Sequence, residues 1–200
     1  MIGPPRRLAF QAQASQSQRE RIVELFPLVQ ELADADLREA VVQIWAHAWR
    51  ISQWRDPADV PFLPDLAQWR LVDHVNSVAL GCDQLAASCR QALGLAFDRD
   101  LLLASALLHD VAKLVELEPG PEGAVESEVG QAVHHATVGA QWALEAGLPW
   151  ALAQAIFTHT PVVSTAPCSP EGLMVHDVDH LVTRATRMAA ASPSPGDRKV

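Results

Sequence analysis

The sequence predicts an all-α fold, organised as a single helical bundle. Apolar residues recur at helical spacing in one segment after another along the chain. No stretch shows the apolar–polar alternation of a β-strand, and no hairpin turn signal joins two apolar runs. Hydrophobic residues make up 49% of the 200 residues, which is ample for a core, and the charged fraction of 20% is not that of a disordered chain.

The first third of the chain predicts two helices and a loop. Apolar spacing favours a helix over 18–33, in which Pro27 is expected to cause a kink or a break. Asp36 is a candidate cap for a second helix that ends near residue 51. Three prolines in 55–64 indicate a loop.

The middle of the chain predicts two long helices. One covers about 66–93 and ends near Gly94. The next begins after a cap at Asp98 and runs to about residue 117. Its segment LLLASALLHDVAKLV is apolar on nearly every side, so we expect this helix at the centre of the bundle, packed all round by others.

The rest of the chain alternates between loops and helices. We expect an acidic flexible loop over 118–128, a helix over 129–146, a helix from Pro149 to about His159, a loop over 161–170 and a last helix over 171–190.

Composition excludes several classes of protein. The net charge of −9 argues against a dedicated nucleic-acid binder, which would present a basic face. Three cysteines without a CxxC motif argue against a disulfide scaffold and a cysteine-rich zinc site. The longest nearly apolar run, 101–108, is too short to span a bilayer, and no apolar stretch of signal-peptide length follows Arg6 and Arg7. We therefore expect a cytoplasmic protein that makes no membrane contact.

The sharpest local feature is the pair His109–Asp110 inside an otherwise apolar segment. Ionisable side chains are costly there unless they are paired or bound to a metal. Lys113 falls between the two when a helix is viewed down its axis, so imidazole, carboxylate and ammonium share one face. A buried polar cluster that only assists packing would explain these three residues equally well.

Further histidines and aspartates on other apolar helix faces favour a metal site. Any one of them is more often a core residue than a ligand, but several helices each supply one, and imidazoles and carboxylates that converge in a bundle core are the materials of a metal site. These residues are His74, His135, His159, Asp177 and Asp179.

The ordered pattern H…HD…H…H…D resembles the HD-domain superfamily of metal-dependent phosphohydrolases. The segment ALLHDVAKL is similar to the superfamily's LLHDxxK, HATVGAQWALEAGLP to HxxxGAxxLxxAGLP, and DHLVTRA to the ADxL helix. The resemblance covers about 66–187. It implies an HD-type domain over 61–190 with the metal site in the core of the bundle. The rest of the sequence predicts an N-terminal helical extension over 1–60 and a disordered tail over 191–200.

The resemblance also implies a set of metal ligands. One ion would be held by His74, His109, Asp110 and Asp179, and a second by the addition of His135 and His159. Nitrogen and oxygen ligands suit one or two divalent transition metal ions, Fe or Mn first, with Mg, Co, Ni or Zn as alternatives.

Two ligand positions have neighbouring alternatives. His134 could replace His135, although the spacing to Gly139 favours His135. Asp177 could replace Asp179, although VDHL fits the ADxL pattern at Asp179. Thr160 follows His159 and no GYP motif is present, so the branch that hydrolyses cyclic di-GMP is not supported.

The resemblance implies that a metal-activated water hydrolyses a phosphate ester, which could be a phosphomonoester, a nucleotide or a cyclic nucleotide. Asp110 would bridge the ions, and Lys113 would neutralise phosphate charge. The expected partner is a small phosphorylated substrate, and 1–60 would cover one side of the bundle or form a homodimer contact. The alternatives are a di-iron oxygenase that cleaves a C–C or C–P bond, and a non-catalytic module that binds a nucleotide or a protein.

Overall fold

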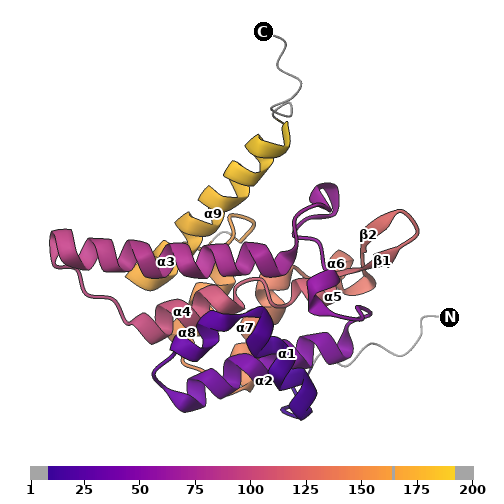
Figure 1. Ribbon diagram of the computed structural model, residues 1–200, viewed down its shortest axis with the longest axis horizontal. Helices are drawn as coiled ribbons and strands as arrows, with labels where there is room; N and C mark the ends of the chain where they lie inside the picture. Colours follow the sequence, from indigo (N-terminus) through magenta and orange to yellow (C-terminus); the bar gives the residue numbers. More distant parts are fainter. Residues whose placement is uncertain (1–8, 164, 192–200) are drawn as a thin grey trace, which may run out of the picture.

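The computed structural model describes residues 9–163 and 165–191, and it is predominantly helical, which confirms the all-α prediction (Figure 1). Its helices are α1 (Gln16–Leu25), α2 (Ala35–Ile51), α3 (Leu71–Leu93), α4 (Arg99–Leu108), α5 (Lys113–Glu116), α6 (Glu128–Ala132), α7 (His135–Glu145), α8 (Trp150–Thr158) and α9 (Pro170–Ala191). Short 3₁₀ turns cover Pro27–Glu31, Pro57–Asp59 and Pro64–Leu66. The tail expected over 191–200 lies almost wholly outside the described residues.

The helix α4 is the centre of the bundle, as its apolar sequence predicts. Every residue from Leu102 to Leu108 is buried. The helices α2, α3, α8 and α9 all contact it. The long α3 crosses one side of the bundle, and the C-terminal half of α9 extends away from the body (Figure 1). Among the described residues, no helix is both long and apolar enough to cross a membrane.

The N-terminal helices pack directly on this core. The chain breaks at Pro27, where α1 gives way to a 3₁₀ turn, because proline cannot donate the next helical hydrogen bond. The cap predicted at Asp36 is wrong. The carboxylate of Asp34 accepts from the backbone N–H groups of Asp36 and Leu37, and α2 begins at Ala35. The indole of Trp45 donates to the carbonyl of Leu107 at 2.9 Å and so ties α2 to α4.

The predicted start of the third helix at 66 is wrong, whereas its end is right. Residues 61–70 form a closed loop, in which the backbone N–H of Phe62 donates to the carbonyl of Trp69 at 2.8 Å. The helix α3 begins only at Leu71 and ends at Gly94, which has the left-handed φ of 69° that glycine adopts without strain. This loop carries Phe62 to the inner end of α3.

The helix predicted over 98–117 is interrupted where its polar residues begin. Asp98 caps α4 as expected, but α4 ends at Leu108. The backbone then tightens, because the N–H of Val111 reaches the carbonyl of Leu108 and that of Lys113 reaches Asp110, each three residues back. The tighter turns change the direction in which the 109–113 side chains point, and α5 resumes at Lys113.

The flexible loop predicted over 118–128 is wrong as well. Strands β1 (Leu117–Gly120) and β2 (Gly123–Glu126) form an antiparallel hairpin, which projects from the body beside α6 (Figure 1). The helix predicted over 129–146 is split into α6 and α7, because the side chain of His134 caps a new helix by accepting from the N–H of Ala136. The helices expected from Pro149 and over 171–190 are present as α8 and α9.

Candidate metal centre

Six side chains from five helical segments converge in the core of the bundle. His74 comes from α3, His109 and Asp110 from the turns after α4, His135 from the start of α7, His159 from the end of α8 and Asp179 from α9. All six are buried, with at most 8% of the residue exposed. Residues that are 105 positions apart in the chain therefore share one small volume, as the resemblance implies.

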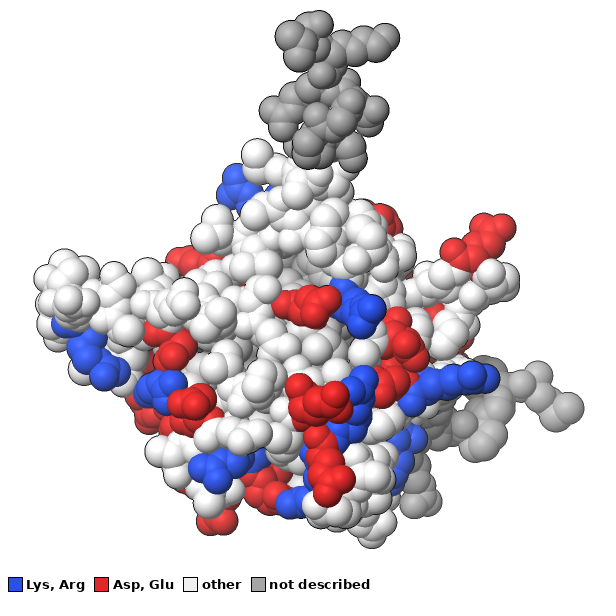
Figure 2. Space-filling view, in the orientation of Figure 1, with Lys and Arg blue, Asp and Glu red and all other residues white. Residues whose placement is uncertain are grey.

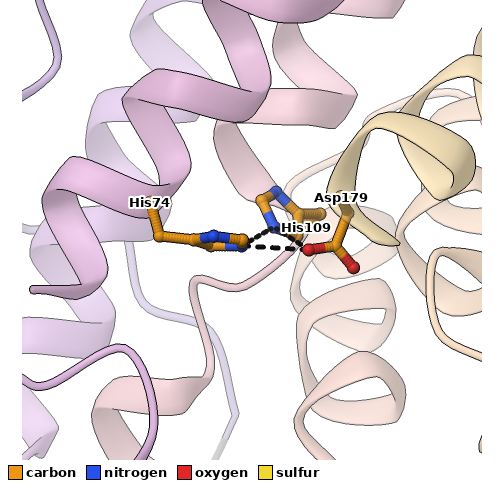
Figure 3. Close-up of side chains that lie close together, drawn as sticks. All are labelled: His74, His109 and Asp179. Atoms are coloured by element: carbon orange, nitrogen blue, oxygen red, sulfur yellow. Dashed lines mark hydrogen bonds and ion pairs between the residues drawn. The ribbon is translucent and has the colours of Figure 1, made fainter. Parts of the chain in front are cut away.

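His74, His109 and Asp179 form the first cluster. The Nε2 atoms of the two imidazoles lie 3.3 Å apart. The Nε2 of His74 is 3.0 Å from Oδ1 of Asp179, and the Nε2 of His109 is 3.9 Å from the same oxygen. Figure 3 shows the three side chains pointing toward one another.

Asp110, His135 and His159 form the second cluster. The Nε2 atoms of the two histidines are again 3.3 Å apart. The Oδ1 of Asp110 lies 3.1 Å from Nε2 of His135 and 3.4 Å from Nε2 of His159. In each cluster, one potential ligand atom from every residue lies within 4.8 Å of the others, a spacing that could hold a metal ion.

The carboxylate of Asp110 stands between the two clusters. Its Oδ1 faces the second cluster, whereas its Oδ2 lies 3.5 Å from Nε2 of both His74 and His109 in the first. Both oxygens are buried and neither accepts a well-aligned hydrogen bond from the described residues, although Oδ2 forms an ion pair with Nζ of Lys113 at 2.8 Å. Buried carboxylate oxygens without such partners are a feature of sites that bind a cation.

The hydrogen bonds of the imidazoles test whether these residues fit a metal. The Nδ1 of His109 lies 2.6 Å from the carbonyl of Ala106, and the Nδ1 of His159 lies 2.6 Å from that of Ile156. A carbonyl only accepts, so each Nδ1 carries a hydrogen, and in the neutral form of each ring the lone pair of Nε2 points into the site. Facing lone pairs repel each other and would bind a cation between them, so the residues fit the implied metal.

Two residues that sequence reasoning missed hold the other imidazoles. Glu116 accepts from Nδ1 of His135 at 2.7 and 2.8 Å. The ring of Phe62 stacks on His74, with 3.7 Å between centroids and 19° between planes. No local motif marks Phe62, and the only available signal for Glu116 was its position one turn beyond Lys113.

The charged groups of the site shift one another's pKa. Burial raises the pKa of Asp110, but the ammonium of Lys113 and the imidazole of His109 hold that pKa well below its usual range. Burial likewise opposes ionisation of Asp179, yet the hydrogen bond with His74 lowers its pKa to about 2. Burial lowers the pKa of His159 to about 4. Ionised carboxylates and a neutral imidazole are the forms that bind a metal ion.

Lys113 contacts the site through Asp110. Its Nζ lies 2.8 Å from Oδ2 of Asp110 and 4.5 Å from the centroid of the Phe62 ring. Only 6% of the residue is exposed. The ammonium therefore stands beside the first cluster without belonging to it.

The structure places the alternative ligands that the sequence left open in different surroundings. Asp179 is buried in the first cluster, whereas Asp177 is exposed on the other side of α9. His135 points its Nε2 at Asp110, whereas the Nδ1 of His134 is used in the cap of α7.

A pocket of about 770 Å³ opens onto both clusters. Asp110, His135, His159 and Asp179 contribute to its floor, together with Lys113, and the hairpin contributes Leu117 and Glu126 to its wall. The helix α9 adds Arg184 and Arg187. On the face shown in Figure 2, basic and acidic side chains lie interspersed over the N-terminal helices.

Comparison with known families gives a match to the HD domain over residues 71–184. This range includes all six residues of the two clusters and Glu116. No match was found among curated proteins or among solved structures.

Proposed function

The chain belongs to the HD-domain family, and we propose that it is a metal-dependent phosphohydrolase that cleaves a small phosphate ester: a phosphomonoester, a nucleotide or a cyclic nucleotide. The observation that carries this proposal is the carboxylate of Asp110, which directs one oxygen to each cluster of buried imidazoles. A carboxylate in that position suits two neighbouring cations.

The first ion would be held by His74, His109 and Asp179, the second by His135 and His159, and Asp110 would contribute one oxygen to each. Divalent Fe or Mn suits this set of imidazoles and carboxylates. Such ions supply Lewis acidity toward a phosphoryl oxygen and acidify a coordinated water.

The pocket supports an anionic organic substrate. A volume of about 770 Å³ holds a phosphate together with a sizeable organic group. Of the Lys and Arg side chains that line it, Lys113 is paired with Asp110 and Arg187 with Asp65, each at 2.8 Å. Arg184 has no ion-pair partner among the described residues, so it is available to a substrate anion.

The test is an activity screen on the metal-loaded protein. Apo protein is loaded with Mn²⁺ or, anaerobically, with Fe²⁺, its metal content is measured, and it is assayed against phosphomonoesters, nucleotides and cyclic nucleotides. We expect about one to two ions per chain and phosphate release that disappears in His135→Ala plus His159→Ala. A protein that binds both ions, releases no phosphate and consumes O₂ with iron would overturn the proposal.

A further inference from the structure

Glu116 holds His135 by both its side chain and its backbone. It is the last residue of α5, and 15% of its side chain is exposed. The Oε1 atom accepts from Nδ1 of His135 at 2.7 Å and from the backbone N–H of the same residue at 3.1 Å. The Oε2 atom lies 2.8 Å from the same Nδ1. The imidazole is therefore fixed in both position and rotation.

This contact has a chemical consequence at the opposite nitrogen. Because Nδ1 donates to a carboxylate, the neutral ring keeps its hydrogen on Nδ1, and Nε2, which points at Asp110 from 3.1 Å, is the nitrogen that can bind a cation. A carboxylate on Nδ1 also makes Nε2 a better electron donor to a cation. His109 and His159 have only a neutral carbonyl at the corresponding place.

The segment between α5 and α7 keeps Glu116 in place. The backbone N–H of Ser127 donates to the carbonyl of Glu116 at 2.8 Å, and its hydroxyl donates to that of Val115. Gly130 in α6 packs directly on the same residue. A Cβ at position 130 would lie 2.5 Å from the Glu116 carbonyl oxygen and 3.1 Å from its Cγ, which is closer than such atoms approach.

We infer that Glu116 is a positioning residue that sets the affinity of the second cluster for its divalent cation, and that the hairpin and α6 serve to hold it. The inference rests on the metal site proposed above. Glu116 would leave the first cluster unaffected, because none of its contacts reaches His74, His109 or Asp179.

The experiment is a titration of apo protein with Mn²⁺, followed by the electron paramagnetic resonance of free and bound ions. We expect two classes of site in the wild type and a coupled spectrum when about two ions are bound. Glu116→Ala should weaken only the second class, by about 10–100-fold, and should lose the coupled spectrum. Glu116→Gln, which keeps an acceptor oxygen but removes the charge, should show a smaller loss.

Two further variants separate the positioning role from a merely structural one. Glu122→Gln removes the charge of an exposed carboxylate in the turn of the hairpin and should bind both ions as the wild type does. Gly130→Ala leaves every ligand and Glu116 itself intact, but should displace Glu116 and weaken the second class. Circular dichroism checks that each variant is folded.

The experiment distinguishes failure of the positioning role from failure of the proposed function. A wild type that binds no Mn²⁺ overturns both. A wild type that binds two ions, with equal affinities in Glu116→Ala, overturns the positioning role alone. Loss of a third ion in Glu116→Gln, with the second unchanged, would also overturn it, because Glu116 would then be a ligand with His134 and His135.

Discussion

The two clusters are alike in their metal-facing atoms and different in what stands behind them. Each contains two imidazole nitrogens 3.3 Å apart and one or more carboxylate oxygens. Behind the first, His74 is held by the stacked ring of Phe62, and its buried Nδ1 has no hydrogen-bond partner among the described residues. Behind the second, His135 is held by the charged carboxylate of Glu116. One cluster thus depends on packing and the other on a charged hydrogen bond.

The surrounding segments differ in the same way. His74 and Asp179 lie on α3 and α9, which have 23 and 22 residues and pack along each other. The second cluster is built from the ends of the shorter α7 and α8 and is supported by a hairpin. Asp179 lies in the middle of α9, where α3 and α8 pack against that helix, whereas His135 and His159 lie at helix ends, where unpaired backbone groups need specific hydrogen bonds. The first cluster should therefore be the more robust metal site.

The largest expected effect is that of removing the residue that both clusters share. Asp110→Ala should abolish both classes of Mn²⁺ site and lower turnover by more than about 1,000-fold, well beyond the 10–100-fold cost of a supporting residue. Added metal should no longer raise its melting temperature, because that rise requires binding to the native state. Elemental analysis and thermal melts measure this.

The control for Asp110 is Asp177→Ala, which removes an exposed carboxylate from α9 and should keep both ions. If Asp110→Ala retained one ion at full occupancy, the two clusters would be independent and the carboxylate would not link them.

Lys113→Met tests the ammonium that contacts the Oδ2 atom of Asp110, on the side of the first cluster. All six potential ligands remain, so metal content should stay nearly intact. Turnover per bound metal should fall by about 100- to 1,000-fold, the scale for loss of one electrostatic stabiliser. Unchanged turnover per bound metal would mean that Lys113 only offsets the charge of Asp110.

The sequence predicted the six potential metal ligands, but not the residues that hold those ligands in place. A histidine or an aspartate in an apolar helix can be recognised from the sequence, because burying such a side chain without a partner costs free energy. Phe62 carries no such mark, since its contact with His74 depends on how the 61–70 loop closes. Glu116 was missed because Pro119 and Gly120 gave no strand signal and concealed the hairpin that follows it.

The break after α4 has a different cause. The helical period is continuous through Leu108 and into 111–117, so sequence pattern alone extends the helix. Tertiary packing overrides it, because tighter turns let both His109 and Asp110 face the site. The same holds at His134, where a capping contact splits one predicted helix into α6 and α7.

Phe62→Leu tests the packing that holds His74. Leucine keeps most of the buried volume but cannot stack, so the first class of Mn²⁺ site should weaken by about tenfold while the second is unchanged. Glu116→Ala should have the opposite effect and weaken only the second class of site. The measurement is the same titration with electron paramagnetic resonance.

The matched control is Phe26→Leu, which removes a buried ring stacked on Trp45 away from both clusters. It should lower stability to a similar degree and leave both metal affinities unchanged. Equal weakening of the two classes in Phe62→Leu would show that the loss is general destabilisation.

The smallest expected effect lies outside both clusters, at Arg184 on the pocket wall. An exposed ion pair contributes at most about 1 kcal/mol, so Arg184→Ala should raise KM for a phosphorylated substrate by up to about fivefold. Metal content and kcat should not change, because Arg184 forms no ion pair with a potential ligand among the described residues. The difference in KM between the wild type and Arg184→Ala should shrink as salt is added, since screening weakens exposed charges first.

Arg90→Ala, on an exposed part of α3, is the control and should leave KM unchanged. A KM for Arg184→Ala equal to that of the wild type at low salt would exclude this arginine from substrate binding and leave recognition of the anion to the two clusters and Lys113.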